Sequence, residues 1–260
     1  MNTGRQTARK INVLNGLREQ IRRLERLENG RRRDARAALP FGIAALDALW
    51  PEGGLPIGAL HEVNSESAAG FAAASAFAAS AAGRLGALVL WCTTSPDFYA
   101  PGLAQVGLPL SRLVVVRART EKEVLAVMEE ALRHSALGCV IGEIPRIGLT
   151  ASRRLALAAE SGATLAFALR RRQSTQGALE PVAAASRWRI SAARSSPHRM
   201  PHLISQAGRG RWTLELLRSR SGRTGTWNVE VPDAQGYLHL PSTLVDGIET
   251  APAPRLRAFG

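Results

Sequence analysis

Short apolar runs alternate with helix-forming segments through the middle of this 260-residue chain. Such alternation is typical of βαβ units, in which buried parallel strands are connected by helices that pack on the faces of the sheet. We therefore predict an α/β fold with a mainly parallel central sheet. The expected strands are Gly58–Val63, Ala87–Trp91, Leu113–Val116, Cys139–Ile141 and Thr164–Leu169, and the expected helices are Phe41–Leu49, Ala68–Ala82, Lys122–Arg133 and Thr150–Glu160.

Three runs after residue 185 follow a different pattern. Trp188–Ser191, Trp212–Leu217 and Trp227–Val231 alternate between apolar and polar side chains with a period of two, which is typical of half-buried strands. The segment Ser221–Gly225 contains the Gly residues of a tight turn between the last two runs. These runs predict antiparallel strands at one edge of the sheet.

The beginning of the chain predicts an N-terminal amphipathic helix, in which leucine and isoleucine recur three and four residues apart and share one face. Asn29-Gly30 is a typical C-terminal cap, and a basic linker follows it. A narrow apolar stripe must be covered by the chain's own core, by a neighbouring copy or by a different protein. We hypothesise a docking face made of Leu14, Leu17, Ile21 and Leu24. The predicted organisation is a basic helix and linker over residues 1–38, a core over residues 39–232 and a mobile tail over residues 233–260.

The net charge of +13 is concentrated in two blocks. Residues 1–38 carry 11 basic and 4 acidic side chains, and residues 161–232 carry 12 and 3. Segregated positive charge indicates contact with a polyanion or an acidic partner. Since 32 of the 34 cations are arginines, a solvated arginine-rich surface explains the composition equally well, and charge alone leaves contact with nucleic acid open.

Composition favours a cytoplasmic protein. The sequence contains no apolar stretch typical of a membrane span and no signal peptide. Cys92 and Cys139 are isolated, so they predict two small buried side chains rather than a disulfide framework or a zinc site. The five histidines show no metal-binding spacing. We predict no metal site, no cofactor and no catalytic residue.

The segment between the first expected strand and the Ala-rich helix stands where a nucleotide-binding P-loop would lie. Such a loop reads Gly-x-x-x-x-Gly-Lys-Ser/Thr, because its glycines let N–H groups wrap phosphates, its Lys neutralises them and its hydroxyl holds magnesium. Here only the second glycine remains, and Phe71 and Ala72 replace the Lys and the hydroxyl residue. Each missing charge-assisted hydrogen bond costs roughly 1.5–3 kcal/mol. The sequence therefore predicts a degenerate nucleotide site at Ser65, Glu66, Ser67, Gly70, Phe71 and Ala72.

Two other interpretations of this loop stay open. Phe71 can pack as a plug in the core, which would make the loop purely structural. The P-loop spacing can also be a coincidence without any nucleotide-binding ancestor.

The order of several motifs resembles the RecA recombinase family over residues 40–170, and more loosely to residue 231. The resemblance is carried by Pro40–Asp47, Gly53–Val63, Glu66–Gly70 and Asp97–Gly107. It implies that residues 39–232 form a degenerate RecA-like core, and it places Glu143 at the position of that family's second acidic strand. Where the family has a carboxylate that activates water, the stretch Leu90–Pro96 has none. The resemblance thus implies a protein that has lost ATP hydrolysis.

The chain resembles the ImuA family more specifically. The arginine-rich N-terminal helix, the segment Ala38–Asp47 and the segment Leu216–Val231 carry this resemblance. It implies a non-catalytic adaptor in SOS-induced translesion DNA synthesis, and hence in damage-induced mutagenesis. The implied partners are RecA, the catalytically dead Y-family polymerase ImuB and an error-prone replicative-type DNA polymerase.

The resemblance also singles out two basic segments. A loop that faces DNA in RecA-type cores here carries Arg170, Arg171 and Arg172, without the aromatic side chains on which single-stranded bases usually stack. Arg218 and Arg220 look like the basic triplet that reaches a neighbour's nucleotide in RecA filaments. Both segments are candidate contacts for single-stranded DNA or an acidic partner, and a solvated loop is the alternative.

Two other functions compete with the adaptor. The first is a DNA-dependent ATPase or recombinase, which micromolar ATP binding would favour. The second is a cell-division inhibitor of the SulA type, also a degenerate RecA-like core, which binding to the tubulin-like division protein would support. The basic N-terminal helix and the arginine-rich C-terminal third fit the division inhibitor less well.

Overall fold

The computed structural model describes residues 38–96, 98–134, 136–171, 180–194 and 210–241. The chain divides into two units, Met1–Ala37 and Ala38–Gly260, and all the described residues belong to the second unit. The predicted N-terminal helix, with its docking face of Leu14, Leu17, Ile21 and Leu24, lies outside the described residues.

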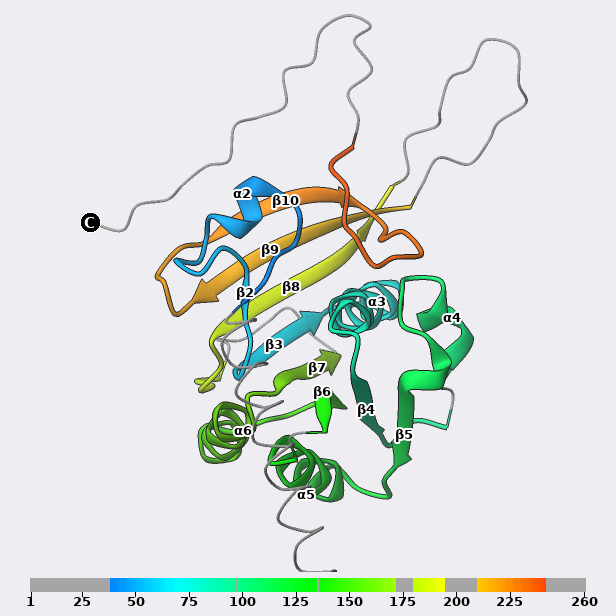
Figure 1. Cartoon of the computed structure of the whole chain (residues 1–260), viewed down its shortest axis with the longest axis vertical. Helices are drawn as coiled ribbons and strands as arrows, with labels where there is room; N and C mark the ends of the chain where they lie inside the picture. Colours follow the sequence, from blue (N-terminus) through cyan, green and yellow to red (C-terminus); the bar gives the residue numbers. More distant parts are fainter. Residues whose placement is uncertain (1–37, 97, 135, 172–179, 195–209, 242–260) are drawn as a thin grey trace, which may run out of the picture. The chain divides into compact units, whose positions relative to one another are not determined.

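An eight-stranded sheet, in the order β10-β9-β8-β3-β7-β6-β4-β5, organises this unit (Figure 1). The strands from β8 to β5 are parallel to one another, whereas β9 pairs antiparallel with β8 and with β10. This arrangement confirms the predicted α/β fold with a mainly parallel sheet and antiparallel edge strands, as expected of a RecA-like core. The strands are β3 (Leu60–Ser65), β4 (Leu88–Thr93), β5 (Leu113–Arg117), β6 (Leu137–Glu143), β7 (Leu165–Arg171), β8 (Ser186–Ala193), β9 (Arg211–Ser219) and β10 (Gly225–Glu230).

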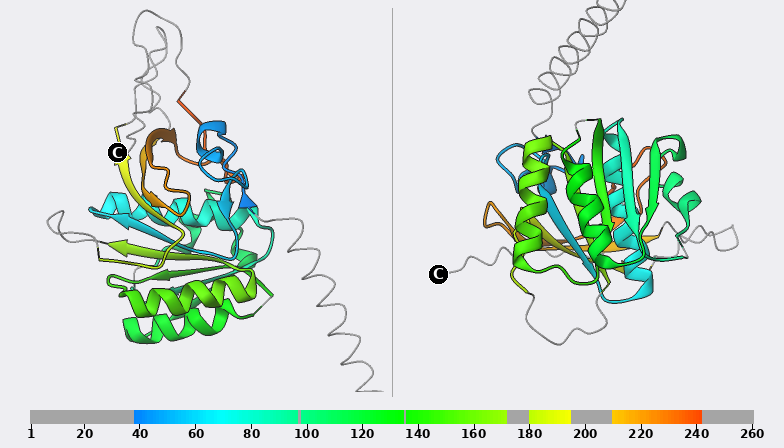
Figure 2. Two further views of the ribbon diagram at one scale, coloured as in Figure 1. Left: turned by 90° about the vertical axis from the view of Figure 1, so that its left-hand side faces the viewer. Right: turned by 90° about the horizontal axis from the view of Figure 1, so that it is seen from below.

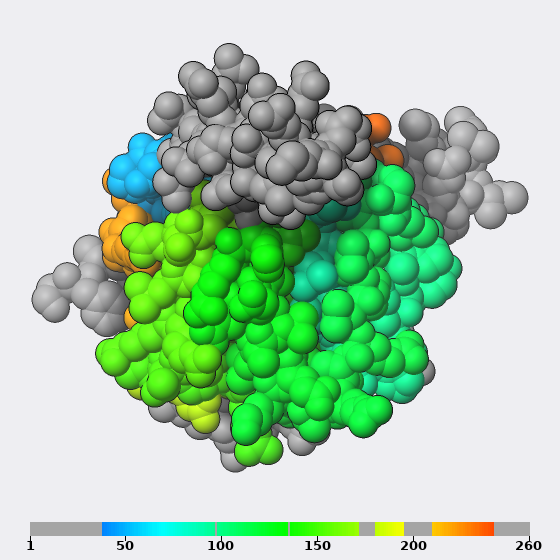
Figure 3. All heavy atoms as spheres, turned by 60° about the horizontal axis from the view of Figure 1, so that its bottom comes forward, coloured from blue at the N-terminus to red at the C-terminus, as the bar shows by residue number. Residues whose placement is uncertain are grey.

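Helices cover both faces of the sheet, so that two separate apolar clusters form (Figure 2). One face carries α3 (Ala68–Arg84) and α4 (Ala100–Ala104), and the other carries α5 (Glu121–Leu132) and α6 (Leu149–Gly162). Figure 3 shows the face on which α5 and α6 lie at the surface. The shorter elements are β1 (Ala38–Leu39), α2 (Ala44–Asp47), β2 (Leu55–Pro56) and the 3-10 helix η1 (Leu110–Arg112). Among the described residues, every helix falls short of the length and apolar character that a bilayer crossing requires.

The Ala-rich helix forms where the sequence predicts it. Alanine is the best helix former, and its small side chain lets α3 lie close to the sheet. Close packing continues to the end of the helix, because a Cβ at Gly83 would lie 2.0 Å from the carbonyl oxygen of Gly107. Any larger residue at this position would push α3 away from the loop after α4.

An aromatic cluster fixes the segment before the sheet onto the face that α3 covers. The rings of Phe41, Trp50, Phe77 and Trp188 are buried, with centroid distances between 5.6 and 6.0 Å. The carboxylate of Asp47 accepts hydrogen bonds from the backbone N–H groups of Phe41 (2.6 Å) and Gly42 (3.0 Å). This carboxylate therefore stabilises the turn that places the Phe41 side chain in the core.

The structure differs from the expected organisation at two places. β8 was expected among the antiparallel edge strands, but it pairs in parallel with β3 and is antiparallel only to β9. In addition, the first residues of the predicted tail pack on the core, where Leu238 is buried and the guanidinium of Arg84 lies 5.2 Å from the ring centre of Tyr237. The packed region thus reaches residue 241, beyond the predicted boundary at residue 232, and residues 242–260 lie outside the described part.

Candidate functional site

Neighbouring parallel strands end side by side at the carboxyl edge of the sheet, and the predicted nucleotide site lies there. β3 ends at Ser65 and β7 ends at Arg171, and these two residues are partners in the strand register. β6 ends at Glu143, and β4 ends at Thr93. The structure therefore brings the loop after β3 and the predicted acidic residue to one edge.

The hydroxyl of Ser67 is committed to the helix that it precedes. Its Oγ accepts a hydrogen bond from the N–H of Gly70 at 3.0 Å and so caps α3. An N-cap of this kind contributes about 1 kcal/mol. Gly70 lies close to β8, because a Cβ there would come within 3.1 Å of the carbonyl oxygen of Ile190. The remaining loop hydroxyl is that of Ser65, which is buried and donates to the carbonyl oxygen of Arg170 at 3.5 Å.

Phe71 fills the position where a P-loop would carry its lysine. The ring is partly buried and packs against the apolar cluster under α3. The guanidinium carbon of Arg171 lies 4.4 Å from the ring centre, which is a cation–π contact worth about 0.5–1 kcal/mol at an exposed site. Ala72, at the position of the metal-binding hydroxyl, is exposed. Phe71 is thus joined to the core on one side and to a cation on the other.

The carboxylate of Glu66 is paired with a cation of β8. Its Oε1 lies 3.4 Å from Nη1 of Arg189. Arg189 also donates two hydrogen bonds, of 2.7 and 3.0 Å, to Glu215 on β9, and these bonds raise the pKa of its guanidinium. The negative charge that the loop carries is therefore paired with a cation that it shares with Glu215.

Both oxygens of Glu143 accept hydrogen bonds from β4. Nε1 of Trp91 donates to Oε1 at 2.9 Å, and the hydroxyl of Thr93 donates to Oε2 at 2.8 Å. Thr93 in turn accepts a hydrogen bond from the N–H of Ser95 at 2.9 Å. Glu143 is at the expected edge, but its carboxylate links two strands.

A buried ion-pair network that was not predicted adjoins this edge. Glu62 on β3 is fully buried, and its carboxylate binds Arg170 at 2.6 Å and also Arg187. Arg170 further donates to the carbonyl oxygen of Pro145 at 3.3 Å, and Arg187 donates to that of Glu180 at 2.6 Å. The carboxylate inside the predicted strand Gly58–Val63 was the available signal, since a carboxylate that is buried in a sheet requires a buried cation.

The candidate DNA or partner contacts separate into different environments. Arg170 is 5% exposed and is held by Glu62, so it is not available to DNA in this structure, whereas Arg171 is exposed. Arg172 lies outside the described residues. Arg218 and Arg220 lie at the other end of the strands, near the amino ends of the parallel ones, because β9 runs antiparallel to β8. The two basic segments therefore do not form one surface.

His61 belongs to the interior. Its Nε2 lies 2.8 Å from the carbonyl oxygen of Pro56, and its Nδ1 lies 2.7 Å from the hydroxyl of Ser186. Since a carbonyl oxygen only accepts, the proton is on Nε2. Burial lowers the pKa of His61 to about 4. Within the part of the chain that the structure describes, no group of three or more His, Cys, Asp or Glu side chains is arranged to hold a metal ion.

Comparison with known proteins gives a relationship over nearly the whole chain. No protein-family model matches the sequence. Among curated proteins, the chain is similar to the protein named "Protein ImuA" from Caulobacter vibrioides (strain NA1000 / CB15N), with 37% identity over 237 residues that cover 85% of this chain and 96% of the relative. The protein of the same name from the strain ATCC 19089 / CIP 103742 / CB 15 gives the same identity and coverage.

Proposed function

Because this chain belongs to the ImuA family, we propose that it is a non-catalytic accessory protein of damage-induced mutagenesis. In this role it connects RecA with ImuB and with an error-prone replicative-type DNA polymerase during translesion synthesis. The family relationship supports the process, and the geometry of the degenerate nucleotide site supports the absence of catalysis.

The main support is that side chains of the loop after β3 already contact other residues of the same protein. Ser67 caps α3, Glu66 pairs with Arg189, and Phe71 packs between the core and Arg171. The side chains of these three loop residues therefore already have partners within the protein. A nucleotide would have to break these contacts before it gained any of its own.

The free energies point in the same direction. A lysine and a metal-binding hydroxyl each supply charge-assisted bonds worth roughly 1.5–3 kcal/mol, and Phe71 and Ala72 supply neither. The positive end of α3 remains, but a helix N-terminus contributes at most about 2 kcal/mol. We therefore expect no ATP binding at cellular concentrations.

A RecA-like core without nucleotide chemistry is suited to work as an adaptor. We propose that the apolar face of Leu14, Leu17, Ile21 and Leu24 docks on RecA. We propose the exposed side chain of Arg171, together with Arg172, as a contact for single-stranded DNA or an acidic partner.

Calorimetric titration with magnesium ATP, followed by a hydrolysis assay with single-stranded DNA, tests the loss of catalysis. We expect no binding heat and no turnover, with RecA as the positive control. Micromolar affinity or DNA-stimulated hydrolysis would show that the chain is an enzyme.

Co-purification with RecA and ImuB tests the adaptor role. The double variant Leu17→Glu/Ile21→Glu is expected to lose RecA, whereas Arg18→Gln/Arg22→Gln, on the polar face of the same predicted helix, should retain it. In a strain that lacks the gene, the wild-type protein should restore ultraviolet-induced mutation and the apolar-face variant should not. Unchanged RecA binding by the apolar-face variant would refute the docking face, and failure of the wild type to affect mutation frequency would refute the process.

A further inference from the structure

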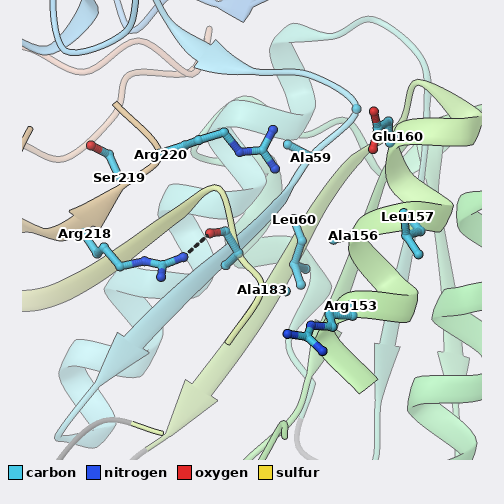
Figure 4. Close-up of a pocket in the computed structure, with 12 residues that line it drawn as sticks. Ala59, Leu60, Arg153, Ala156, Leu157, Glu160, Ala183, Arg218, Ser219 and Arg220 are labelled. Atoms are coloured by element: carbon cyan, nitrogen blue, oxygen red, sulfur yellow. Dashed lines mark hydrogen bonds between the residues drawn. The ribbon is translucent and has the colours of Figure 1, made fainter. Parts of the chain in front are cut away.

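A cleft of about 620 Å³ opens at the amino ends of the parallel strands (Figure 4). The degenerate nucleotide site lies at the opposite, carboxyl ends of these strands. It lies between the start of β3, one side of α6 and the end of β9. Its lining combines small and aliphatic residues with three arginines and one carboxylate. The lining residues are Gly58, Ala59, Leu60, Arg153, Ala156, Leu157, Glu160, Ala183, Ala184, Arg218, Ser219 and Arg220.

The three arginines reach the cleft from separate elements. Figure 4 shows Arg218 and Arg220 approaching from the strand side and Arg153 from α6. Arg218 is fixed, because its Nη2 donates to the carbonyl oxygens of Ala184 (2.8 Å) and Val182 (3.4 Å). The cleft is therefore a place where positive charge converges on a concave surface.

Two of these arginines have guanidinium groups without a hydrogen-bond or ion-pair partner among the described residues. Arg153 and Arg220 are exposed, and among the described residues their guanidinium groups make no hydrogen bond and no ion pair. The neighbouring Arg154 differs, since its Nη2 lies 2.5 Å from a carboxylate oxygen of Glu129. Glu160 is the carboxylate in the lining, so the cleft has an excess of positive charge.

An exposed leucine lies beside the cations. Leu157 on α6 is 66% exposed although it lines a concave surface, and the same lining includes Leu60 and Ala156. Covering this side chain with an apolar group would remove both from water. An aliphatic anchor surrounded by polar contacts is a common arrangement in protein recognition sites.

We propose that this cleft binds an acidic segment of a partner protein, with an aliphatic side chain against Leu157 and carboxylates on Arg153 and Arg220. Charge complementarity identifies the acidic partner, and the exposed leucine distinguishes a peptide from a nucleic-acid backbone, which offers no aliphatic group. The chain's own N-terminal segment is disfavoured, because residues 1–38 carry 11 basic and 4 acidic side chains. The cleft is separate from the degenerate nucleotide loop, and its binding of an acidic segment does not depend on the role in mutagenesis.

Fluorescence anisotropy with the full chain tests the proposal. The probe is a fluorescein-labelled peptide of sequence Glu-Asp-Glu-Leu-Asp-Glu-Asp, and a second peptide carries Ser in place of Leu. We expect saturable binding of the leucine peptide, and the double variant Arg153→Gln/Arg220→Gln should raise its Kd by roughly tenfold or more. Arg154→Gln, which removes one arginine from the same helix outside the cleft, should leave the Kd unchanged. Leu157→Ser should weaken binding of the leucine peptide and not of the serine peptide.

Several outcomes would overturn the proposal. The first is no binding of the leucine peptide, and the second is an equal loss with Arg154→Gln. The third is binding of a labelled oligothymidine that Arg153→Gln/Arg220→Gln abolishes, which would assign the cleft to DNA. The fourth is a dimer of the full chain that this double variant dissociates, which would assign it to a second copy. Circular dichroism and the thermal midpoint of each variant establish that it is folded.

Discussion

The guanidinium of Arg171 lies 4.4 Å from the centre of the Phe71 ring, over the position at which a P-loop would place its lysine. The two residues come from the end of β7 and the first turn of α3, so the contact joins a strand to the neighbouring helix. A cation is thus present at the predicted nucleotide site, but it contacts an aromatic face.

A double-mutant cycle measures this contact. Phe71→Leu keeps much of the apolar packing and removes the ring, while Arg171→Gln removes the charge. We expect each variant to lower the free energy of unfolding, with a coupling energy of about 0.5–1 kcal/mol in urea denaturation. Strictly additive losses would mean that the stacking contributes nothing to stability.

The buried carboxylate of Glu62 should be among the most sensitive positions in the core. Glu62→Gln removes the buried counter-charge that Arg170 and Arg187 share, and removing one partner of a buried ion pair costs about 3–5 kcal/mol. Urea denaturation measures the loss. Glu180→Gln is the matched control, because that carboxylate is 57% exposed and lies 3.5 Å from Arg170, and surface pairs contribute only about 0–1 kcal/mol. Equal losses in both variants would contradict a special role for the buried pair.

His61 should make the fold less stable in mild acid. Its pKa is lowered from 6.5 to about 4, mainly by burial and further by the charge of Arg220, while its bond to Pro56 acts in the opposite sense. Between these pH values the unfolded chain binds a proton that the folded chain does not bind. This contribution to stability is therefore complete above pH 6.5 and is lost as the pH falls toward 4, by about 3 kcal/mol in total.

Urea denaturation between pH 7.5 and 4.5 detects this effect. His61→Asn removes the titrating group, so the difference in free energy between the wild type and this variant should shrink as the pH falls. A constant difference across the range would show that the pKa of His61 is the same in the folded and the unfolded chain.

The two thiols should be unreactive in the folded protein. Cys92 and Cys139 are buried and unpaired, and burial raises the pKa of Cys92 to about 12 and that of Cys139 further still. Because the thiolate is the reactive form, a disulfide reagent at pH 8 should label neither cysteine until urea is added. Rapid labelling of the native protein would indicate that the strands β4 and β6 open.

Local signals explain which elements could be predicted. The run of alanines in α3 and the apolar runs of β4, β6 and β7 lie within a few residues of their predicted bounds, because each segment carries its own helical or buried-strand pattern. The burial of Cys92 and Cys139 was predicted because the two cysteines are isolated in the sequence, and it is confirmed. The place of the loop between β3 and α3 was also evident, because a strand pattern is followed there by a turn-like segment and then by the run of alanines.

Long-range contacts explain what could not be predicted. Glu62 and Arg187 are 125 residues apart in the sequence, and nothing in their neighbours links them. The direction of β8 depends on its pairing with β3, and period-two alternation does not reveal the direction of a strand. The packing of Leu238 depends on a turn that follows the last strand. The cleft at Arg153 and Arg220 likewise arises from segments that meet only in the folded chain.

The strand β3 reaches both sites, because the cleft begins beside Leu60 and the degenerate loop begins at Ser65. Between these ends, the carboxylate of Glu62 ties β3 to Arg170 on β7 and to Arg187 on β8. Sliding β3 along its axis would break both salt bridges, at a cost larger than the 1–3 kcal/mol typical of allosteric coupling. We therefore expect that a peptide bound in the cleft leaves the loop at Ser65 unchanged. The cleft and the loop should then bind their partners independently of each other.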